Sequence, residues 1–154
     1  MGLAIGTATV LLLDDDEAFP RGGAIPAGWV IPAAATTGWH VSSDPGAFEG
    51  ALQLRSGMVN DNETAGLEVT GTYQAGMVTF RYKVSSELNF DFLRFFVDGV
   101  EVGKFSGAVA AWTPFSTPVT AGPHTFRWVY GKDASGTVGA DAAWIDAVTL
   151  PAVQ

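Results

Sequence analysis

Apolar and polar residues alternate along several short stretches of the chain, a pattern that predicts strands with one buried face. The clearest example is Gly76–Ser85, where apolar or aromatic residues occupy every second position from Val78 to Val84. Further strands are predicted at Ala51–Arg55, Gly66–Thr70, Phe90–Val97, Val100–Phe105, His124–Tyr130 and Asp141–Leu150. No stretch keeps the apolar spacing of a helix face over three turns, so we expect almost no helix.

The turns between these stretches indicate how the strands connect. Asp98-Gly99 separates two apolar runs and is a strong signal for a tight hairpin. Turn residues recur roughly every 8–12 positions, which is typical of a β-sandwich. The chain is therefore predicted to be all-β: an antiparallel two-sheet β-sandwich of the jelly-roll type. A lipocalin-like barrel is less favoured because the predicted strands are short and unequal.

The length of 154 residues fits one domain. We predict an N-terminal arm or first strand at residues 1–13, the sandwich at 14–151 and a C-terminal tail at 152–154. The segment Phe19–Trp39 is rich in proline and glycine and is predicted to be a loop within the domain.

The first thirteen residues are strongly apolar but too few to span a bilayer. No basic residue precedes Arg21, so the segment lacks the positive region of a secretion signal. We expect it to add to the sheet of a neighbouring subunit, or to pair inside its own sandwich over Thr7–Leu13. The residues predicted to contact a partner are Leu3, Ile5, Val10 and Leu11.

Composition narrows the classes of function. With 16 acidic residues against 8 basic ones, the net charge is −8, which argues against nucleic-acid binding. The chain has no cysteine, which excludes disulfides, thiolate catalysis and cysteine-ligated zinc. The only histidines, His40 and His124, have neighbours that fit no zinc-protease motif, and no G-x-S-x-G elbow occurs. We expect His124 to be a hydrogen-bonded strand residue.

Two carboxylates, Glu87 and Asp91, lie close together in the sequence. A carboxylate pair of this kind serves glycoside hydrolysis when the two groups are suitably spaced. The favoured alternative is that they pair with Arg127 or Lys132 and stabilise the turn at Asn89-Phe90.

Two long segments, Val78–Gly107 and Trp112–Pro151, resemble a jelly-roll module of bacterial and phage surface proteins. That module is similar to MAM-type (meprin-like) adhesion domains and concanavalin-like carbohydrate-binding domains. The resemblance covers roughly residues 15–151 and implies a jelly-roll fold with a binding or adhesion role. The matching positions are Ser85, Ser86, Glu87, Asp91, Leu93, Phe95, Asp98, Gly99, His124, Trp128, Tyr130, Lys132, Asp133, Ser135, Asp141, Ala143, Trp144, Ile145 and Asp146.

The same resemblance implies a structural calcium ion between the first and last strands. The acidic run Asp14–Glu17 supplies the hard oxygen ligands that calcium prefers. The predicted ligands are Asp15, Asp16 and Glu17, together with Asp141 or Asp146 from the last strand. Equally, the run could be a solvated turn that keeps an edge strand from pairing.

The five tryptophans divide by their surroundings. Trp128 and Trp144 lie within alternating strands and are predicted to be core, together with Phe80, Phe95 and Ile145. Trp29, Trp39 and Trp112 lie beside glycine, alanine or loop residues. We expect these three to be the candidates for stacking against a sugar.

The leading interpretation is a non-enzymatic structural protein of a phage virion, such as a capsid decoration (cement) protein or a tail protein. Its partners would be copies of itself or capsid or tail subunits, most simply as a homo-oligomer. Release by host lysis would explain an adhesion fold without an export signal. The alternative is a calcium-stabilised carbohydrate-binding module of a larger secreted protein, located outside the cell or on its surface. A small glycan-active enzyme ranks third, and neither a membrane nor a nucleic acid is expected as a partner.

Overall fold

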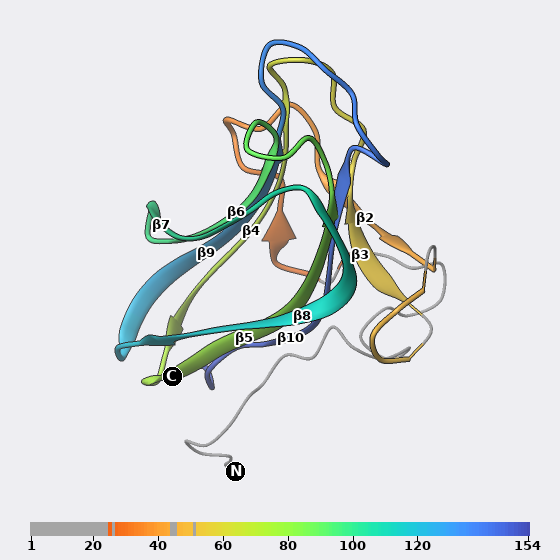
Figure 1. Cartoon of the computed structure of the whole chain (residues 1–154). Helices are drawn as coiled ribbons and strands as arrows, with labels where there is room; N and C mark the ends of the chain where they lie inside the picture. Colours follow the sequence, from red (N-terminus) through yellow and green to blue (C-terminus); the bar gives the residue numbers. More distant parts are fainter. Residues whose placement is uncertain (1–24, 26, 44–45, 51) are drawn as a thin grey trace.

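The computed structural model of the chain describes residues 25, 27–43, 46–50 and 52–154. Within these residues the chain forms ten β-strands, arranged as two facing sheets (Figure 1). No helix in this part of the chain is long and apolar enough to cross a membrane. The partner residues Leu3, Ile5, Val10 and Leu11 lie outside the described residues, as do Asp15, Asp16 and Glu17.

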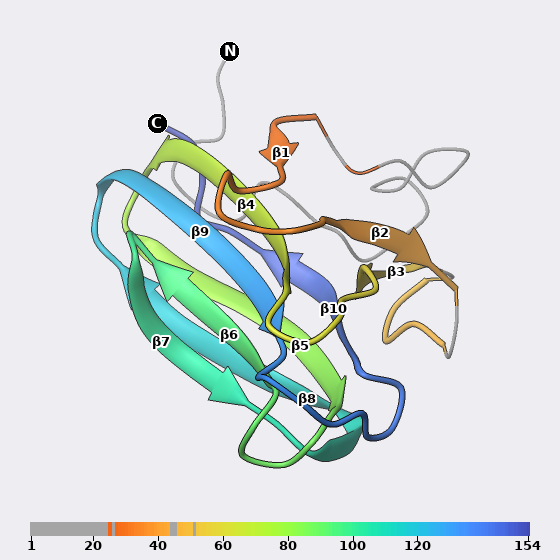
Figure 2. The same ribbon diagram turned by 90° about the horizontal axis from the view of Figure 1, so that it is seen from above.

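Each sheet has five strands, and every pairing between strands is antiparallel. The β9 sheet contains, in spatial order, β1 (Trp29–Val30), β4 (Thr64–Tyr73), β9 (Gly122–Gly131), β6 (Phe92–Val97) and β7 (Val100–Phe105). The β10 sheet contains β2 (Trp39–Ser42), β3 (Gln53–Ser56), β10 (Ala142–Thr149), β5 (Gly76–Ser85) and β8 (Ala108–Val119). Seen from above, the two sheets form separate layers (Figure 2). The predicted jelly-roll sandwich is confirmed.

The core fills the space between the sheets. Alternate residues of β5, from Val78 to Val84, point inward and are buried, as the sequence pattern predicts. Aromatic rings dominate this core: Phe80 and Phe95 lie 5.1 Å apart between ring centroids, and Phe95 and Trp128 lie 4.8 Å apart. The predicted burial of Phe80, Phe95, Trp128 and Ile145 in this core is confirmed, whereas Trp144 is buried on the outer side of the β10 sheet.

Strand β8 is the one long strand that the sequence pattern did not predict. Pro114 and Pro118 interrupt its alternation, and they lie opposite Arg81 and Met77 of β5. Proline cannot donate a backbone hydrogen bond and is tolerated where a strand has a free edge. Because β8 is the edge of the β10 sheet, its prolines are accommodated there.

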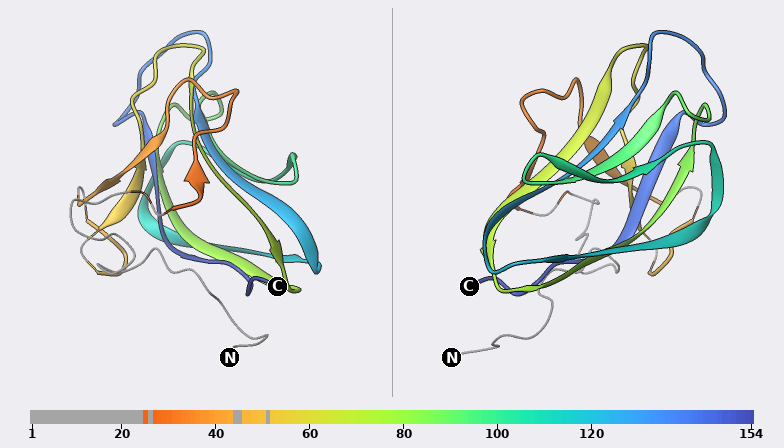
Figure 3. Two further views of the ribbon diagram at one scale, coloured as in Figure 1. Left: turned by 180° about the vertical axis from the view of Figure 1, so that it is seen from behind. Right: turned by 60° about the vertical axis from the view of Figure 1, so that its left-hand side comes forward.

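The connecting loops lie at the two ends of the sandwich. Loops 57–63, 86–91 and 132–141 gather at one end, and the C-terminus lies at the other (Figures 1 and 3). The predicted hairpin joins β6 to β7, with φ of 52° at Asp98 and 83° at Gly99. Two successive positive φ angles are characteristic of a type I′ turn, for which Asp-Gly is well suited.

Candidate functional site

The outer face of the β10 sheet carries a row of cationic and aromatic side chains. Trp144 of β10 lies opposite Arg55 of β3 on one side and Lys83 of β5 on the other. His40 of β2 continues the row beyond Arg55. The alternation of β5 explains this placement, because burying Tyr82 and Val84 between the sheets directs Lys83 to the outer face.

Two of the cations beside Trp144 lie over aromatic rings. The guanidinium carbon of Arg55 is 5.3 Å from the centroid of the Trp144 ring. The ammonium of Lys83 is 4.6 Å from the centroid of the Trp112 ring. Both distances are within the range of cation–π attraction. We call His40, Arg55, Trp144, Lys83 and Trp112 the cation–aromatic row.

A groove of about 410 Å³ opens beside this row. Arg55 and Lys83 supply two charged groups, Ser85 adds a hydroxyl, and Trp144, only 6% exposed, completes this part of the lining. The rest of the lining is Val84, Ala108, Val109, Ala110 and Ala140. A concave, mostly apolar surface with a few converging polar groups is the usual form of a small-molecule site.

The electrostatics of the row differ from those of the acidic chain as a whole. Burial lowers the pKa of the Lys83 ammonium. Among the described residues no carboxylate forms an ion pair with Lys83, whose ammonium lies over the Trp112 ring. Burial, and then the charge of Arg55, lower the pKa of His40. Arg55 and Lys83 thus place two cationic groups on the outer face of the β10 sheet, whereas the lowered pKa of His40 favours its neutral imidazole.

Residues 46–50 cover the neighbouring part of the same face. The Asp146 carboxylate accepts hydrogen bonds from the backbone N–H groups of Phe48, at 2.8 Å, and Glu49, at 3.1 Å. The Phe48 ring meets the Trp112 ring edge-on, with 6.4 Å between the ring centroids. The guanidinium carbon of Arg81 lies 4.5 Å from the centroid of the Phe48 ring. These contacts fix Trp112 at the surface beside the groove.

Two of the three tryptophans predicted to be exposed are buried instead. Trp29 is 7% exposed and stacks on Trp128 in the core. Trp39 is 6% exposed, and its Nε1 donates to the Ala65 carbonyl at 3.1 Å. Their loop-like sequence neighbours were misleading, because short strands carry both rings into the sandwich. Only Trp112 lies at the surface, half-buried.

The two predicted metal ligands near the last strand do not come together. Asp141 and Asp146 are five residues apart along extended chain, roughly 16 Å, too far to share one ion. Asp141 accepts hydrogen bonds from Tyr130 and Lys132, whereas Asp146 is fully buried beneath residues 48 and 49. A calcium site shared with Asp14–Glu17 therefore stays a prediction for one of them at most.

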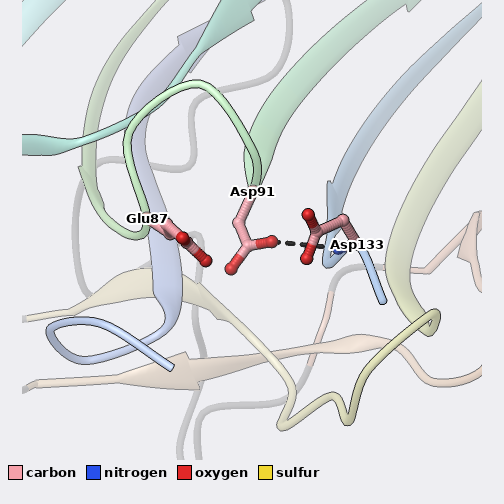
Figure 4. A group of neighbouring side chains, drawn as sticks. All are labelled: Glu87, Asp91 and Asp133. Carbon is pink, nitrogen blue, oxygen red and sulfur yellow. Dashed lines mark hydrogen bonds between the residues drawn. The ribbon is translucent and has the colours of Figure 1, made fainter. Parts of the chain in front are cut away.

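A different group of carboxylates is brought together at the loop end. The side-chain oxygens of Glu87, Asp91 and Asp133 lie within 4.8 Å of one another (Figure 4). The expected ion pair between Asp91 and Lys132 is present at 3.8 Å, but Arg127 pairs with Glu68 instead, at 2.9 Å. Glu87 and Asp91 are neighbours in the sequence and were predicted as a pair. Asp133 was not predicted to join them, because it lies 42 residues beyond Asp91.

No family model matches the sequence, and no curated protein matches it either. Solved structures do match. The TmCBM61 module, solved in complex with beta-1,4-galactotriose, has a TM-score of 0.58 at 15% identity, over 93% of this chain and 97% of that one. The CBM22-1–CBM22-2 tandem domain of Xyn10C from Paenibacillus barcinonensis has a TM-score of 0.54 at 14% identity, over 99% and 47%.

A third match is the secreted serine protease VesC from Vibrio cholerae, with a TM-score of 0.56 at 19% identity. It covers 74% of this chain but only 24% of the protease. At such low identities these likenesses establish a common fold. The chain thus shares its β-sandwich fold with these structures, and its likeness to MAM-type domains stays a prediction.

Proposed function

We propose that the chain is a non-catalytic carbohydrate-binding module that acts outside the cell. The observation that carries the proposal is the groove on the outer face of the β10 sheet. It places the Trp144 ring, two cationic groups and a serine hydroxyl around one hollow. A sugar ring offers both apolar C–H faces and hydroxyl groups, so it matches a lining of this mixed kind.

The charge of the groove favours acidic saccharides. Lys83 lies in the lining and has no ion pair with a carboxylate among the described residues. A uronate carboxylate would supply the missing partner, and Arg55 lies across Trp144 from it. Charge-assisted hydrogen bonds of this type are roughly twice as strong as neutral ones.

The fold comparisons support a binding role without specifying the ligand. TmCBM61 was solved with a bound galactotriose, and the Paenibacillus tandem is a pair of CBM22 domains of Xyn10C. Accessory modules of one fold bind many different ligands, so the ligand must be argued from the groove itself.

The experiment is a binding assay with two polysaccharides that differ in charge. Affinity electrophoresis and calorimetry would compare polygalacturonate with neutral β-1,4-galactan. We expect retardation by the acidic polymer. Ala110 is an exposed residue of the groove lining, so Ala110→Trp should fill the groove and abolish binding while leaving the core intact.

The matched control is Ala121→Trp, which adds the same ring in the turn between β8 and β9, away from the groove. This variant should bind as the unchanged protein does. Equal loss in both variants, or retention of binding by Ala110→Trp, would remove the groove as the site. The proposal would be overturned if the unchanged protein bound neither polygalacturonate nor β-1,4-galactan.

The virion role stays a second proposal, founded on the apolar residues 1–13. If that segment joins a neighbouring subunit, deleting residues 1–6 should abolish assembly without lowering the melting temperature. Sedimentation and thermal unfolding measure the two effects separately. An assembly that survives the deletion would leave the carbohydrate-binding proposal alone.

A further inference from the structure

Two turns bring three carboxylates together at the loop end of the sandwich. Glu87 and Asp91 flank the turn between β5 and β6, and Asp133 follows β9. Figure 4 shows the Asp91 carboxylate between the other two. All three offer ligand oxygens within 4.8 Å of one another. We call them the carboxylate cluster.

Two oxygens of the cluster are buried without a hydrogen bond. Asp91 is fully buried; one of its oxygens accepts from the Asp133 N–H at 2.9 Å, but its Oδ2 accepts from no donor. Glu87 Oε2 is likewise buried and has no hydrogen-bond partner. Leaving a buried charged acceptor unsatisfied is costly, and native structures contain few such groups. A bound cation would satisfy both oxygens at once.

The neighbouring lysine does not meet this need. Lys132 lies 3.8 Å from Asp91 Oδ2, beyond hydrogen-bond distance. Its three donors go elsewhere: to the Gly136 carbonyl at 2.7 Å, to the Thr137 hydroxyl at 3.4 Å and to Asp141. An ammonium group has no fourth donor.

The charge balance also calls for a further cation. The ammonium of Lys132 donates a hydrogen bond to Asp141, and it lies 3.8 Å from an Asp91 oxygen and 4.0 Å from an Asp61 oxygen. The charge of Lys132 is therefore already paired with Asp141. Asp61 and Asp91 share this single ammonium, and among the described residues neither Glu87 nor Asp133 has an ion pair with a cation.

The turn that carries Glu87 and Asp91 is held in place by its own hydrogen bonds. Ser86 Oγ donates to the Asp91 carbonyl at 2.8 Å and accepts from the Gly107 N–H at 3.1 Å. The Asp91 N–H donates to the Glu87 carbonyl at 3.1 Å. Ligands fixed in this way lose little further freedom when an ion binds.

We propose that the carboxylate cluster is a binding site for one calcium ion. Calcium prefers carboxylate and carbonyl oxygens at about 2.3–2.6 Å, so two ligands on opposite sides of the ion lie about 4.8 Å apart. This agrees with the spread of the cluster. The site lies at the loop end, apart from the Asp14–Glu17 run, and it does not depend on glycan binding by the groove.

The test is a calcium titration of the whole protein after treatment with EDTA and removal of the chelator. Calorimetry with calcium chloride should give one site per chain, and calcium should raise the melting temperature. Glu87→Gln and Asp133→Asn each remove one ligand charge from a half-buried side chain. Because losing even an outer-shell partner of a metal weakens binding about 10- to 100-fold, each should weaken it at least tenfold.

Glu101→Gln is the control, because Glu101 lies in β7, beyond the Asp98-Gly99 hairpin, and pairs there with Arg94 of β6. This variant should bind calcium as tightly as the unchanged protein. The proposal is overturned if the unchanged protein takes up no calcium. It is equally overturned if Glu87→Gln and Asp133→Asn bind with unaltered affinity, since the ion would then lie elsewhere in the chain.

Discussion

The indole of Trp29 stacks on the indole of Trp128, with ring centroids 5.4 Å apart and planes inclined by 15°. Trp29 belongs to the two-residue strand β1, and Trp128 lies two strands away in β9. The contact therefore anchors the first described strand to the aromatic core. It assigns Trp29 a role in stability, in place of the sugar contact that its loop-like sequence suggested.

Replacing Trp29 with alanine should reduce the free energy of unfolding by about 3–5 kcal/mol, the usual cost of removing a large buried aromatic ring. Urea denaturation followed by circular dichroism measures the change. Trp112→Ala is the natural comparison, because Trp112 is only half-buried on the outer face. This substitution should reduce the free energy of unfolding clearly less than Trp29→Ala does. Equal effects of the two substitutions would contradict the assignment.

Lys83→Gln should weaken binding of an acidic polysaccharide and remove much of its dependence on salt. The Lys83 ammonium is the groove cation without a carboxylate partner among the described residues, so a ligand carboxylate would be its counter-charge. Raising the salt concentration screens such an attraction in the unchanged protein. Calorimetry at two salt concentrations measures this. A variant with the same salt dependence as the parent would show that Lys83 does not contact the ligand.

The pair formed by His124 and Asp98 should make stability depend on pH. Nδ1 of His124 lies 2.7 Å from Asp98 Oδ2, and this hydrogen bond raises the pKa of His124. Burial alone would raise the pKa of Asp98, but the bonds from His124 and Thr125 lower it. The stabilisation that His124 contributes to the folded state is thus complete below its usual pKa of 6.5. It is lost as the pH rises through the raised pKa of the folded protein. The stabilisation that Asp98 contributes is lost only in acid, as the pH falls through its lowered pKa.

Thermal melts between about pH 6 and pH 9 should therefore show the melting temperature falling more in the unchanged protein than in Asp98→Asn. Asparagine keeps the positive φ of the turn and an oxygen for the Thr125 N–H, so it removes only the charge. The effect should stay below about 1 kcal/mol, because half-exposed pairs are screened by solvent. Parallel pH profiles for the two proteins would rule out this coupling.

Ser86→Ala should cost about 1–3 kcal/mol, because it leaves the Gly107 N–H and the Asp91 carbonyl with one partner fewer in a buried place. Urea denaturation measures the loss. If the carboxylate cluster holds calcium, the same variant should also bind the ion more weakly, since the turn would be less fixed. Ser106→Ala, which removes only an exposed bond to the Asn89 N–H, is the control and should cost much less.

The fold class and most of the strands follow from the local pattern of residues along the chain. Alternation in Gly76–Ser85 and the Asp98-Gly99 turn reflect local geometry, since side chains of a strand point to opposite faces and a tight turn needs particular backbone angles. These features are confirmed at the predicted positions. The pattern did not predict β8, because this strand contains two prolines. Those prolines are acceptable only because β8 is at the edge of its sheet.

Which residues meet depends instead on how the two sheets assemble. Trp144 is buried as predicted, yet it lies on the outer face beside Arg55 and Lys83, because burial alone does not tell which side of a sheet a residue faces. Asp133 joins Asp91 across 42 residues of sequence through the register of β6 and β9, a pairing that no local spacing encodes. Long-range strand pairing is a property of the whole sandwich, so the groove and the carboxylate cluster become visible only once both sheets are assembled.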